Sequence, residues 1–246
     1  MRAMILAAGL GTRLRPLTND RPKALVEVCG RTLLEITLRR LASVGISEVI
    51  VNVHHFADLV IDYLERNKNF GMRIAISRED ILLDTGGGLK KAGWFFLEQD
   101  SNEPFLLHNV DVISNIDLEK MMESHRETQA LATLAVQNRE TSRYLLFDEQ
   151  DHLCGRQVRG GTPEIIYQTR QTQALAFSGI HVISPQLLTP LAEEGIFSII
   201  PSYLRLAGEG AKITAFRADS YYWRDLGKPE NIQQTGEDVR SGIISL

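Results

Sequence analysis

The sequence predicts an α/β protein built on a doubly wound, mainly parallel sheet. Short apolar runs alternate with helical patterns through the first half, the connections between them are short, and the first run ends in a glycine-rich loop. The chain has 246 residues, 43% of them hydrophobic, which is enough for a substantial core. Short apolar runs with polar turns after residue 137 predict a β-rich second half packed on the first.

The first half begins with Met4–Ala8, a continuous apolar stretch typical of a strand buried on both faces. Thr32 and Glu35 have the spacing of a capping box, and Gly45 stands where the following helix should end. The other elements predicted here are strand 49–51, helix 58–66, strand 73–77, helix 88–96, strand 105–107, helix 118–125 and strand 130–136.

The second half is predicted to contain more strands than helices. Its expected elements are strands 144–147, 153–158, 164–168 and 173–183, a short helix behind Pro185, helix 200–207, strands 212–217 and 221–223, and a helix after Pro229. No low-complexity linker separates the halves. We therefore expect one domain over residues 1–246, with residues 1–137 and 138–246 as its two parts.

Composition narrows the classes of function. Lys and Arg total 27 against 31 Asp and Glu, so we expect no nucleic-acid partner. No stretch approaches the roughly 18 apolar residues that cross a bilayer, and the first apolar run is too short for a signal peptide. We expect a cytoplasmic protein with no membrane partner. Cys29 and Cys154 lack a CxxC spacing and predict two reduced thiols.

The loop after the first strand combines glycines with positive charge. Gly9 and Gly11 allow backbone N–H groups to approach phosphate oxygens. The cations of this loop are Arg13, Arg15 and Lys23. A dinucleotide-binding loop is disfavoured because Leu14 occupies its third glycine position, and no Walker A sequence is present. A purely structural turn is the remaining alternative to an anion site at the carboxyl edge of the sheet.

Gly9-x-Gly11-Thr12-Arg13, followed ten residues later by Lys23, resembles the signature loop of the sugar-1-phosphate nucleotidyltransferases. The similarity is densest over residues 1–112. Within the family, the chain most resembles short bacterial members such as N-acetylmuramate-1-phosphate uridylyltransferases and mannose- or heptose-1-phosphate guanylyltransferases. The resemblance implies a Rossmann-like nucleotidyltransferase fold and a nucleotide-sugar-forming enzyme that uses UTP or GTP. A non-catalytic regulatory domain on the same fold is the alternative.

The resemblance also implies roles for particular residues of the nucleotide-binding half, residues 1–137. Nucleotide binding falls to Ala8, Gly9, Gly11, Thr12, Arg13, Lys23, Asp84, Gly87 and Gly88. Arg13, Lys23 and Asp111 are the implied catalytic residues, with Arg13 on the β- and γ-phosphates and Lys23 on the α-phosphate. The sugar phosphate then attacks the α-phosphorus in line with the departing pyrophosphate.

Three consecutive glycines follow Asp84 and Thr85, and we expect this run to precede a helix. Such a run is costly in conformational entropy, so bare backbone is required there. The resemblance implies that Gly87 and Gly88 approach the nucleobase, while a flexible loop is the alternative. On this basis, Gly87→Val is expected to damage nucleotide binding more than stability.

Two aspartates complete the implied site. Asp111 follows strand 105–107 and Asp225 ends a late strand, positions that a turn or helix cap also explains. The resemblance implies that both bind one Mg²⁺ between the two substrates. We expect the two carboxylates to repel each other when no metal is bound. Val110 departs from the family, which usually has a small residue there.

The sugar-phosphate-binding half, residues 138–246, matches the family less closely. Phe177–Ile180 resembles the sugar-contacting segment, which gives Gly179 as a sugar-binding residue, and Lys228 is a second candidate because it could neutralise a phosphate. A glycine bulge and an exposed helix-start lysine are the respective alternatives. The Glu-Lys pair of longer members has no clear equivalent, so Arg156 and Arg159 are further candidates for the sugar phosphate. The implied partners are a nucleoside triphosphate and a sugar-1-phosphate, and a homo-oligomer is left open.

Overall fold

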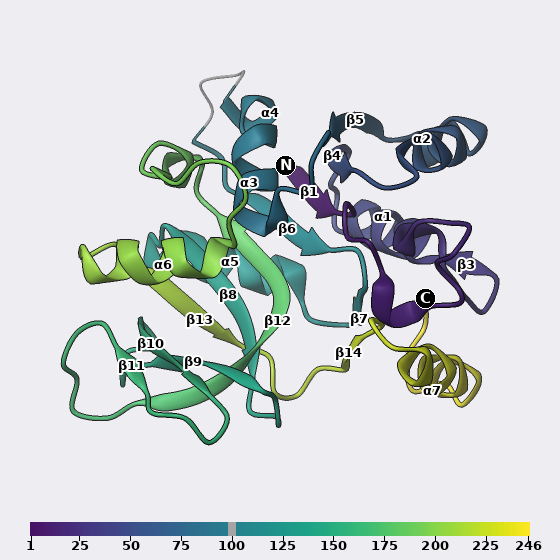
Figure 1. Ribbon diagram of the computed structural model, residues 1–246. Helices are drawn as coiled ribbons and strands as arrows, with labels where there is room; N and C mark the ends of the chain where they lie inside the picture. Colours follow the sequence, from purple (N-terminus) through teal and green to yellow (C-terminus); the bar gives the residue numbers. More distant parts are fainter. Residues whose placement is uncertain (98–101) are drawn as a thin grey trace.

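The computed structural model describes residues 1–97 and 102–246. Its centre is a ten-stranded sheet (Figure 1). The strands of this sheet are β1 (Arg2–Leu6), β4 (Glu48–Val53), β5 (Arg73–Arg78), β6 (Phe105–Asn109), β8 (Ala132–Gln137), β9 (Arg143–Phe147), β10 (Leu153–Val158), β11 (Glu164–Ile165), β12 (Gln173–Ile183) and β13 (Ile213–Arg217).

The sheet confirms a mainly parallel arrangement. Strands β5, β4, β1 and β6 lie side by side and parallel, in that order. The long strand β12 lies antiparallel between β6 and β8, and β13 pairs parallel with β8. The start of β12 leaves the central strands and pairs with β9, which continues to β10 and β11. Strands of the second half therefore extend the sheet of the first.

Two small sheets lie beside the central one. Strands β2 (Glu27–Val28) and β3 (Arg31–Thr32) pair antiparallel ahead of the first long helix. Strand β7 (Val112–Ser114) pairs antiparallel with β14 (Trp223–Asp225), far along the chain. The β7–β14 pair is what brings the end of the chain back to the carboxyl edge of β6. Sequence analysis did not predict β2, β3 or β7.

Helices cover both faces of the sheet, as the doubly wound prediction requires. The α-helices are α1 (Leu33–Ser43), α2 (Ala57–Arg66), α3 (Asp84–Ala92), α4 (Trp94–Leu97), α5 (Leu118–Thr128), α6 (Ile199–Gly208) and α7 (Pro229–Arg240). Along β1, Ala3 and Ile5 pack into the core formed with α1, α2 and α5, whereas Met4 packs into the core formed with α3, α4 and α6. Figure 1 shows α1 and α2 beside β4 and β5, and α6 at the opposite end.

Local signals in the sequence account for most element boundaries. The Thr32 hydroxyl accepts a hydrogen bond from the Glu35 N–H at the start of α1, as the capping pattern predicts. Gly45, which has a φ of +76°, follows the C-cap residue of α1, where the sequence predicts the helix to end. Ends are less accurate: β1 stops at Leu6 instead of Ala8, and β14 begins at Trp223 instead of Tyr221.

The predicted start of the third helix is wrong. Helix α3 begins at Asp84, so the three glycines form part of its first turns instead of preceding it. Gly86, Gly87 and Gly88 are buried there, close against other parts of the chain. The glycines permit close packing of the helix, a possibility that composition alone does not separate from a loop.

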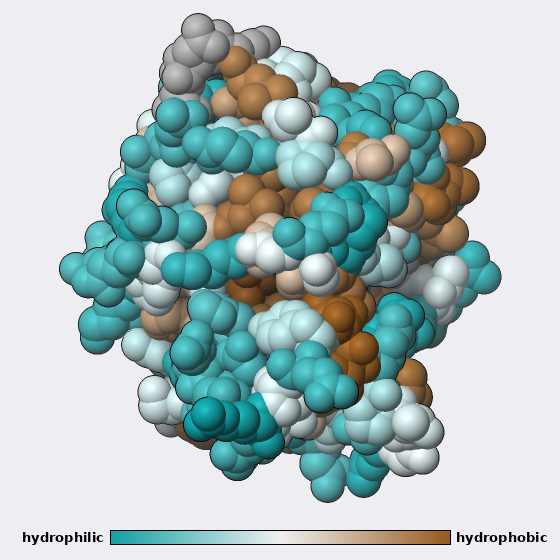
Figure 2. All heavy atoms as spheres, turned by 90° about the vertical axis from the view of Figure 1, so that its left-hand side faces the viewer, coloured by the Kyte–Doolittle hydropathy of each residue, from teal (hydrophilic) through white to brown (hydrophobic). Residues whose placement is uncertain are grey.

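The face of the molecule that carries α6 is mostly polar (Figure 2). Figure 2, which faces the side carrying α6, shows hydrophilic residues around a band of hydrophobic ones through the middle of that face. Single exposed apolar side chains include Ile196 before α6 and Val158 at the end of β10. No described helix is long and apolar enough to span a bilayer.

Candidate active site

The glycine-arginine loop leaves β1 at the carboxyl edge of the sheet. Gly11 has a φ of +64°, and a Cβ there would lie 3.0 Å from Thr18 Cγ2 and 3.1 Å from Lys23 Cβ. The Thr18 hydroxyl donates to the Gly11 carbonyl at 2.8 Å. No atom of the described residues lies within 4 Å of the Cβ position of Gly9, which is exposed. The loop is thus folded back on Lys23, with open space above Gly9.

A cavity of about 450 Å³ opens between this loop, the end of β6 and the start of α3. Residues predicted from the sequence that line it are Ala8, Gly9, Lys23, Asp84 and Asp111. The fold therefore brings together residues from three separate predicted segments. Gly87 and Gly88 do not line the cavity, and Thr12 and Arg13 lie outside its lining as well.

The glycines of α3 are packed rather than open to a ligand. A Cβ on Gly87 would overlap the carbonyl oxygen of Gly195, and one on Gly88 would lie 2.8 Å from Glu79 Oε1. Asp84, at the start of the helix, has a φ of +61°, and its carboxylate accepts from the Thr85 N–H at 2.6 Å. Asp84 and Thr85 face the cavity, so they are the members of this run placed to touch a ligand.

Asn52 is a cavity residue that sequence analysis missed. Its side-chain oxygen accepts from the Ala7 N–H at 2.7 Å, and its amide donates to Glu79 at 2.7 Å. These bonds hold the start of the loop to the segment before α3. Asn52 lies one residue beyond the predicted strand 49–51, so its burial within β4, where an amide needs hydrogen-bond partners, was not apparent from the sequence.

Lys23 and Asp111 form an ion pair at the floor of the cavity. Both side chains are 13% exposed, so the pair is shielded from water. The negative charge of Asp111 is therefore balanced by Lys23. This ion pair, and not the expected repulsion from Asp225, determines the electrostatic environment of the Asp111 carboxylate. The lysine is held at the loop by its backbone position, one residue after Pro22.

The two predicted metal-binding aspartates are neighbours, although they are far apart in sequence. Val112 and Asp225 are register partners across β7 and β14, and the Leu226 N–H donates to the Asp111 carbonyl at 2.8 Å. Asp225 Oδ1 accepts from the Gly227 N–H at 2.5 Å. A Cβ on Gly227 would overlap the Arg13 guanidinium and would lie 2.6 Å from Asp225 Oδ1. Arg13 is thus beside Asp225.

Val110 fits its position without strain. It is buried in the core and is not among the residues with positive φ. Its N–H donates to the Leu6 carbonyl at 3.2 Å, continuing the pairing of β6 with β1. An ordinary backbone accommodates the β-branched side chain, so the departure from the family pattern does not distort the segment that carries Asp111.

Gly179 lies in a bulge of β12. The register with β8 shifts between Phe177 and His181, and Gly179 has a φ of +74°. A Cβ there would lie 2.9 Å from the Asn109 side-chain amide and 3.0 Å from Val112. The glycine bulge considered as an alternative is present, and it sits against the end of β6.

The cations predicted for the sugar phosphate do not converge on the cavity. Lys228 is exposed at the N-cap of α7. Arg156 and Arg159 are exposed and form ion pairs with Glu164 at 2.6 Å and Glu140 at 3.3 Å. The sequence suggested that both arginines contact the sugar phosphate. In the structure they are instead paired with glutamates on an outer edge of the sheet.

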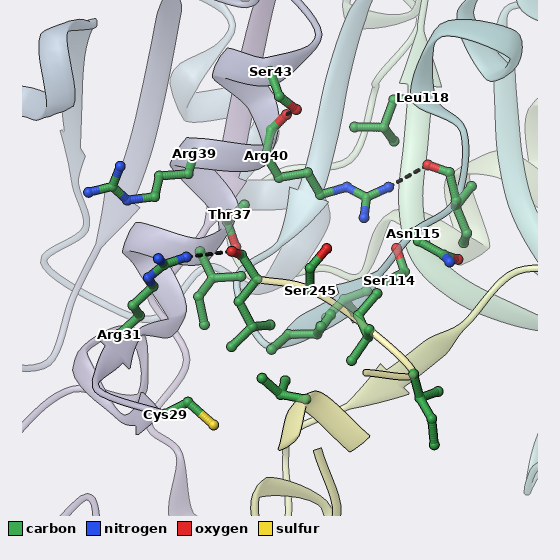
Figure 3. A pocket seen from close by; sticks show the side chains of 18 of the residues that line it. Cys29, Arg31, Thr37, Arg39, Arg40, Ser43, Ser114, Asn115, Leu118 and Ser245 are labelled. Carbon is green, nitrogen blue, oxygen red and sulfur yellow. Dashed lines mark hydrogen bonds between the residues drawn. The ribbon is translucent and has the colours of Figure 1, made fainter. Parts of the chain in front are cut away.

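A larger cavity, about 950 Å³, lies between α1, β7 and residues 242–246. Figure 3 shows Arg40 of α1 reaching across it to the Ile116 carbonyl. Burial lowers the pKa of Arg40 to about 10. None of the sequence-predicted site residues lines this cavity. The smaller cavity is therefore the candidate active site.

Comparison with known proteins agrees with this geometry. The nucleotidyl transferase family model matches residues 2–152. N-acetylmuramate alpha-1-phosphate uridylyltransferase of Caulobacter vibrioides is 34% identical over 93% of this chain and 92% of its own length. Mannose-1-phosphate guanyltransferase beta-B of Xenopus laevis is 30% identical over 94% of this chain, which spans 62% of that protein.

The fold has solved counterparts. The structure of HddC from Yersinia pseudotuberculosis in complex with GMP-PN has a TM-score of 0.74 to this chain at 24% identity, covering 96% of this chain and 98% of HddC. The chain belongs to the nucleotidyl transferase family, in agreement with the resemblance seen in its loop.

Proposed function

We propose that this chain is a sugar-1-phosphate nucleotidyltransferase that joins UTP and a sugar-1-phosphate into a nucleotide-sugar and pyrophosphate. The observation that carries the proposal is the junction of the Gly9–Lys23 loop with Asp111 at one cavity, next to the β7–β14 pair that carries Asp225. Membership of the nucleotidyl transferase family supports the reaction class. We also propose that the protein acts in the cytoplasm.

The reaction needs positioning and charge neutralisation more than acid–base chemistry. An oxygen of the sugar phosphate attacks the α-phosphorus of the triphosphate. The new P–O bond forms as the bond to the β-phosphate breaks, and pyrophosphate leaves with the electron pair. A phosphate monoester is already an anion near pH 7, so no general base is required. Repulsion between the two substrates is the main barrier.

Residues of the first half are placed to bind the triphosphate. The backbone of Gly9 and Gly11 can approach phosphate oxygens closely. Lys23 lies at the cavity floor, where its ammonium group can move from Asp111 to the α-phosphate. Arg13, beside Asp225, can fork onto the β- and γ-phosphates. We assign residues 1–137 to the nucleotide and residues 138–246, through Asp225 and Gly179, to the sugar phosphate.

The two aspartates suit a hard divalent cation such as Mg²⁺, because Asp111 directly precedes β7 and Asp225 lies on its partner strand β14, and both offer carboxylate oxygens. Within residues 1–97 and 102–246, no three His, Cys, Asp or Glu side chains converge. Asp111 and Asp225 would hold the cation with phosphate oxygens and water as its other ligands. When bound, it supplies charge neutralisation between the two phosphate groups.

The comparisons favour one pair of substrates. The Caulobacter uridylyltransferase matches this chain over nearly its whole length and is named for N-acetylmuramate α-1-phosphate. We therefore propose UTP and N-acetylmuramate-1-phosphate as the first pair to test. The guanyltransferase relative supports GTP and mannose-1-phosphate as the competing pair.

The test is a substrate panel with purified protein and Mg²⁺. Each of four nucleoside triphosphates is combined with N-acetylmuramate-, glucose-, mannose- and heptose-1-phosphate, and nucleotide-sugar and pyrophosphate are measured together. The proposal predicts equal amounts of both products, highest with UTP. Nucleotide binding without product from any pair would favour the non-catalytic alternative. Product from GTP alone would reassign the base.

A further inference from the structure

The proposed reaction leaves one charge without an assigned partner. A sugar-1-phosphate carries nearly two negative charges at pH 7 and must lie close to Asp225. Lys23 and Arg13 are assigned to the triphosphate, and Arg156 and Arg159 already pair with glutamates on an outer edge. The cation proposed between the two phosphate groups is shared with the triphosphate, so the sugar-1-phosphate has no positive group of its own on the side of the site formed by β12 and β14.

Arg139 lies on that side. It follows β8, and its guanidinium carbon lies 3.6 Å from the centre of the Trp223 ring. Its Nη2 donates to the Phe177 carbonyl at 2.8 Å. The indole N–H of Trp223 donates to the Ser178 carbonyl at 2.7 Å. One arginine thus touches both β14, which carries Asp225, and the β12 bulge, which carries Gly179.

The guanidinium has donors that the protein does not use. Among residues 1–97 and 102–246, only its Nη2 has a hydrogen-bond partner and no carboxylate forms an ion pair with it, so Nη1 is unused, while Nε is buried without a partner. Burial lowers the pKa of Arg139, and the nearby Asp225 carboxylate acts in the opposite direction. A partly buried cation with an unsatisfied donor is unfavourable unless an anion completes its contacts.

We propose that Arg139 binds the phosphate group of the sugar-1-phosphate substrate, an inference that rests on the proposed function. Stacking on Trp223 and the bond to Phe177 fix the plane of the guanidinium. Nη1 and the second hydrogen of Nη2 then recognise phosphate oxygens beside Asp225, while the buried Nε stays within the protein. Arg139 was not predicted as a site residue from the sequence. Its contacts with Trp223 and Phe177 become apparent only in the folded chain.

A purely structural role makes a different prediction. If Arg139 only joined β8, β12 and β14, its loss would disturb Asp225 and affect both substrates. A phosphate-binding role affects the sugar-1-phosphate alone. Arg139→Gln removes the charge while retaining a polar side chain, and Arg139→Lys retains the charge without the planar fork. Arg143→Gln is the matched control, because Arg143 is exposed at the start of β9.

The experiment measures KM for each substrate separately, using the pair that the wild-type protein turns over fastest. Arg139→Gln should raise the KM for the sugar-1-phosphate at least about tenfold, the range expected for a lost charge-assisted hydrogen bond, with the KM for the triphosphate nearly unchanged. The KM of Arg139→Lys for the sugar-1-phosphate should lie between the values of the wild-type and Arg139→Gln proteins. Calorimetric binding of the sugar-1-phosphate to the nucleotide-loaded protein should weaken in the same order.

Other outcomes overturn the proposal. Equal increases in both KM values would make Arg139 a positioning residue for β14, and unchanged values for both variants would exclude contact with substrate. If Arg139→Gln does not fold, Arg139→Lys decides alone, because a KM equal to that of the wild type contradicts a planar phosphate contact. A wild-type protein that forms no nucleotide-sugar would reject the proposed function itself, an outcome distinct from either of these.

Discussion

The pairing of Lys23 with Asp111 is the most informative contact at the scale of single residues. Two side chains implied to act on different groups, one on phosphate and one on metal, neutralise each other in the protein alone. Substrate and cation binding would therefore exchange partners without leaving a buried charge unpaired. This arrangement explains how a shielded carboxylate and ammonium can coexist before the substrates arrive.

Lys23→Ala should reduce turnover by about 10²-fold or more, because the α-phosphate charge is left without its cation. The structure adds a second effect: Asp111, only 13% exposed, loses its partner. The metal-free variant should therefore have a lower melting temperature than the wild type. Steady-state rates and thermal unfolding measure the two effects, with Asp111→Asn as the background for comparison. If Lys23→Ala lowers the melting temperature by the same amount in the Asp111→Asn protein, loss of the ion pair is not the cause.

Asp111→Asn and Asp225→Asn should each abolish most turnover, and the double variant should be scarcely worse than either, because both residues serve one cation. Asp111→Asn should also lose the ion pair with Lys23, so it is not expected to gain stability. Mg²⁺ binding, measured by calorimetry with and without nucleotide, should be weak alone and tighter with nucleotide. Losses that multiply in the double variant would contradict a shared site.

At the scale of elements, the sequence predicts boundaries best where polar turns flank a strand or a capping residue begins a helix. Strands 153–158 and 173–183 match β10 and β12 because apolar residues bounded by polar turns define them locally. Strands β7 and β14 are short, and their pairing depends on segments far apart in the chain. Asp111 and Asp225 were identified by family resemblance, whereas Asn52 and Arg139 needed the packed structure.

The glycines of α3 give a prediction that replaces the one made from sequence. A side chain at Gly87 would overlap the Gly195 carbonyl, so Gly87→Val should chiefly reduce stability, by several degrees or more in melting temperature. Gly208→Ala is the control, because it lies in α6 with only Ile166 within 4 Å, at 3.9 Å. That change should be neutral or slightly stabilising. Normal stability with impaired nucleotide binding would restore the earlier interpretation.

At the scale of the whole molecule, buried histidines predict acid sensitivity. Burial lowers the pKa of His108 and His125 to about 4 and that of His181 to about 3. In the unfolded chain these groups titrate near 6.5, so between about pH 4 and 6.5 the unfolded state binds more protons. The free energy of unfolding should therefore be highest above pH 6.5 and fall towards pH 4.

Urea unfolding at several pH values measures this dependence. Each histidine contributes at most about 1.4 kcal/mol per pH unit to the slope. His125→Gln should make the slope shallower, because glutamine does not titrate, while His55→Gln, a change at an exposed position, should leave it unaltered. An identical slope in wild-type and His125→Gln proteins would show that His125 does not contribute to the acid sensitivity.

At the scale of the whole molecule, the proposed reaction requires both halves of the chain to meet at one reacting phosphorus. The most direct test supplies a sugar-1-phosphate whose phosphate oxygens are labelled with ¹⁸O, together with unlabelled triphosphate and Mg²⁺. Direct attack predicts that the nucleotide-sugar keeps all of the label, including the oxygen that bridges its two phosphates, and that pyrophosphate carries none. Asp225→Asn should form almost no labelled product. Label in the pyrophosphate, or undiminished product from Asp225→Asn, would contradict the account.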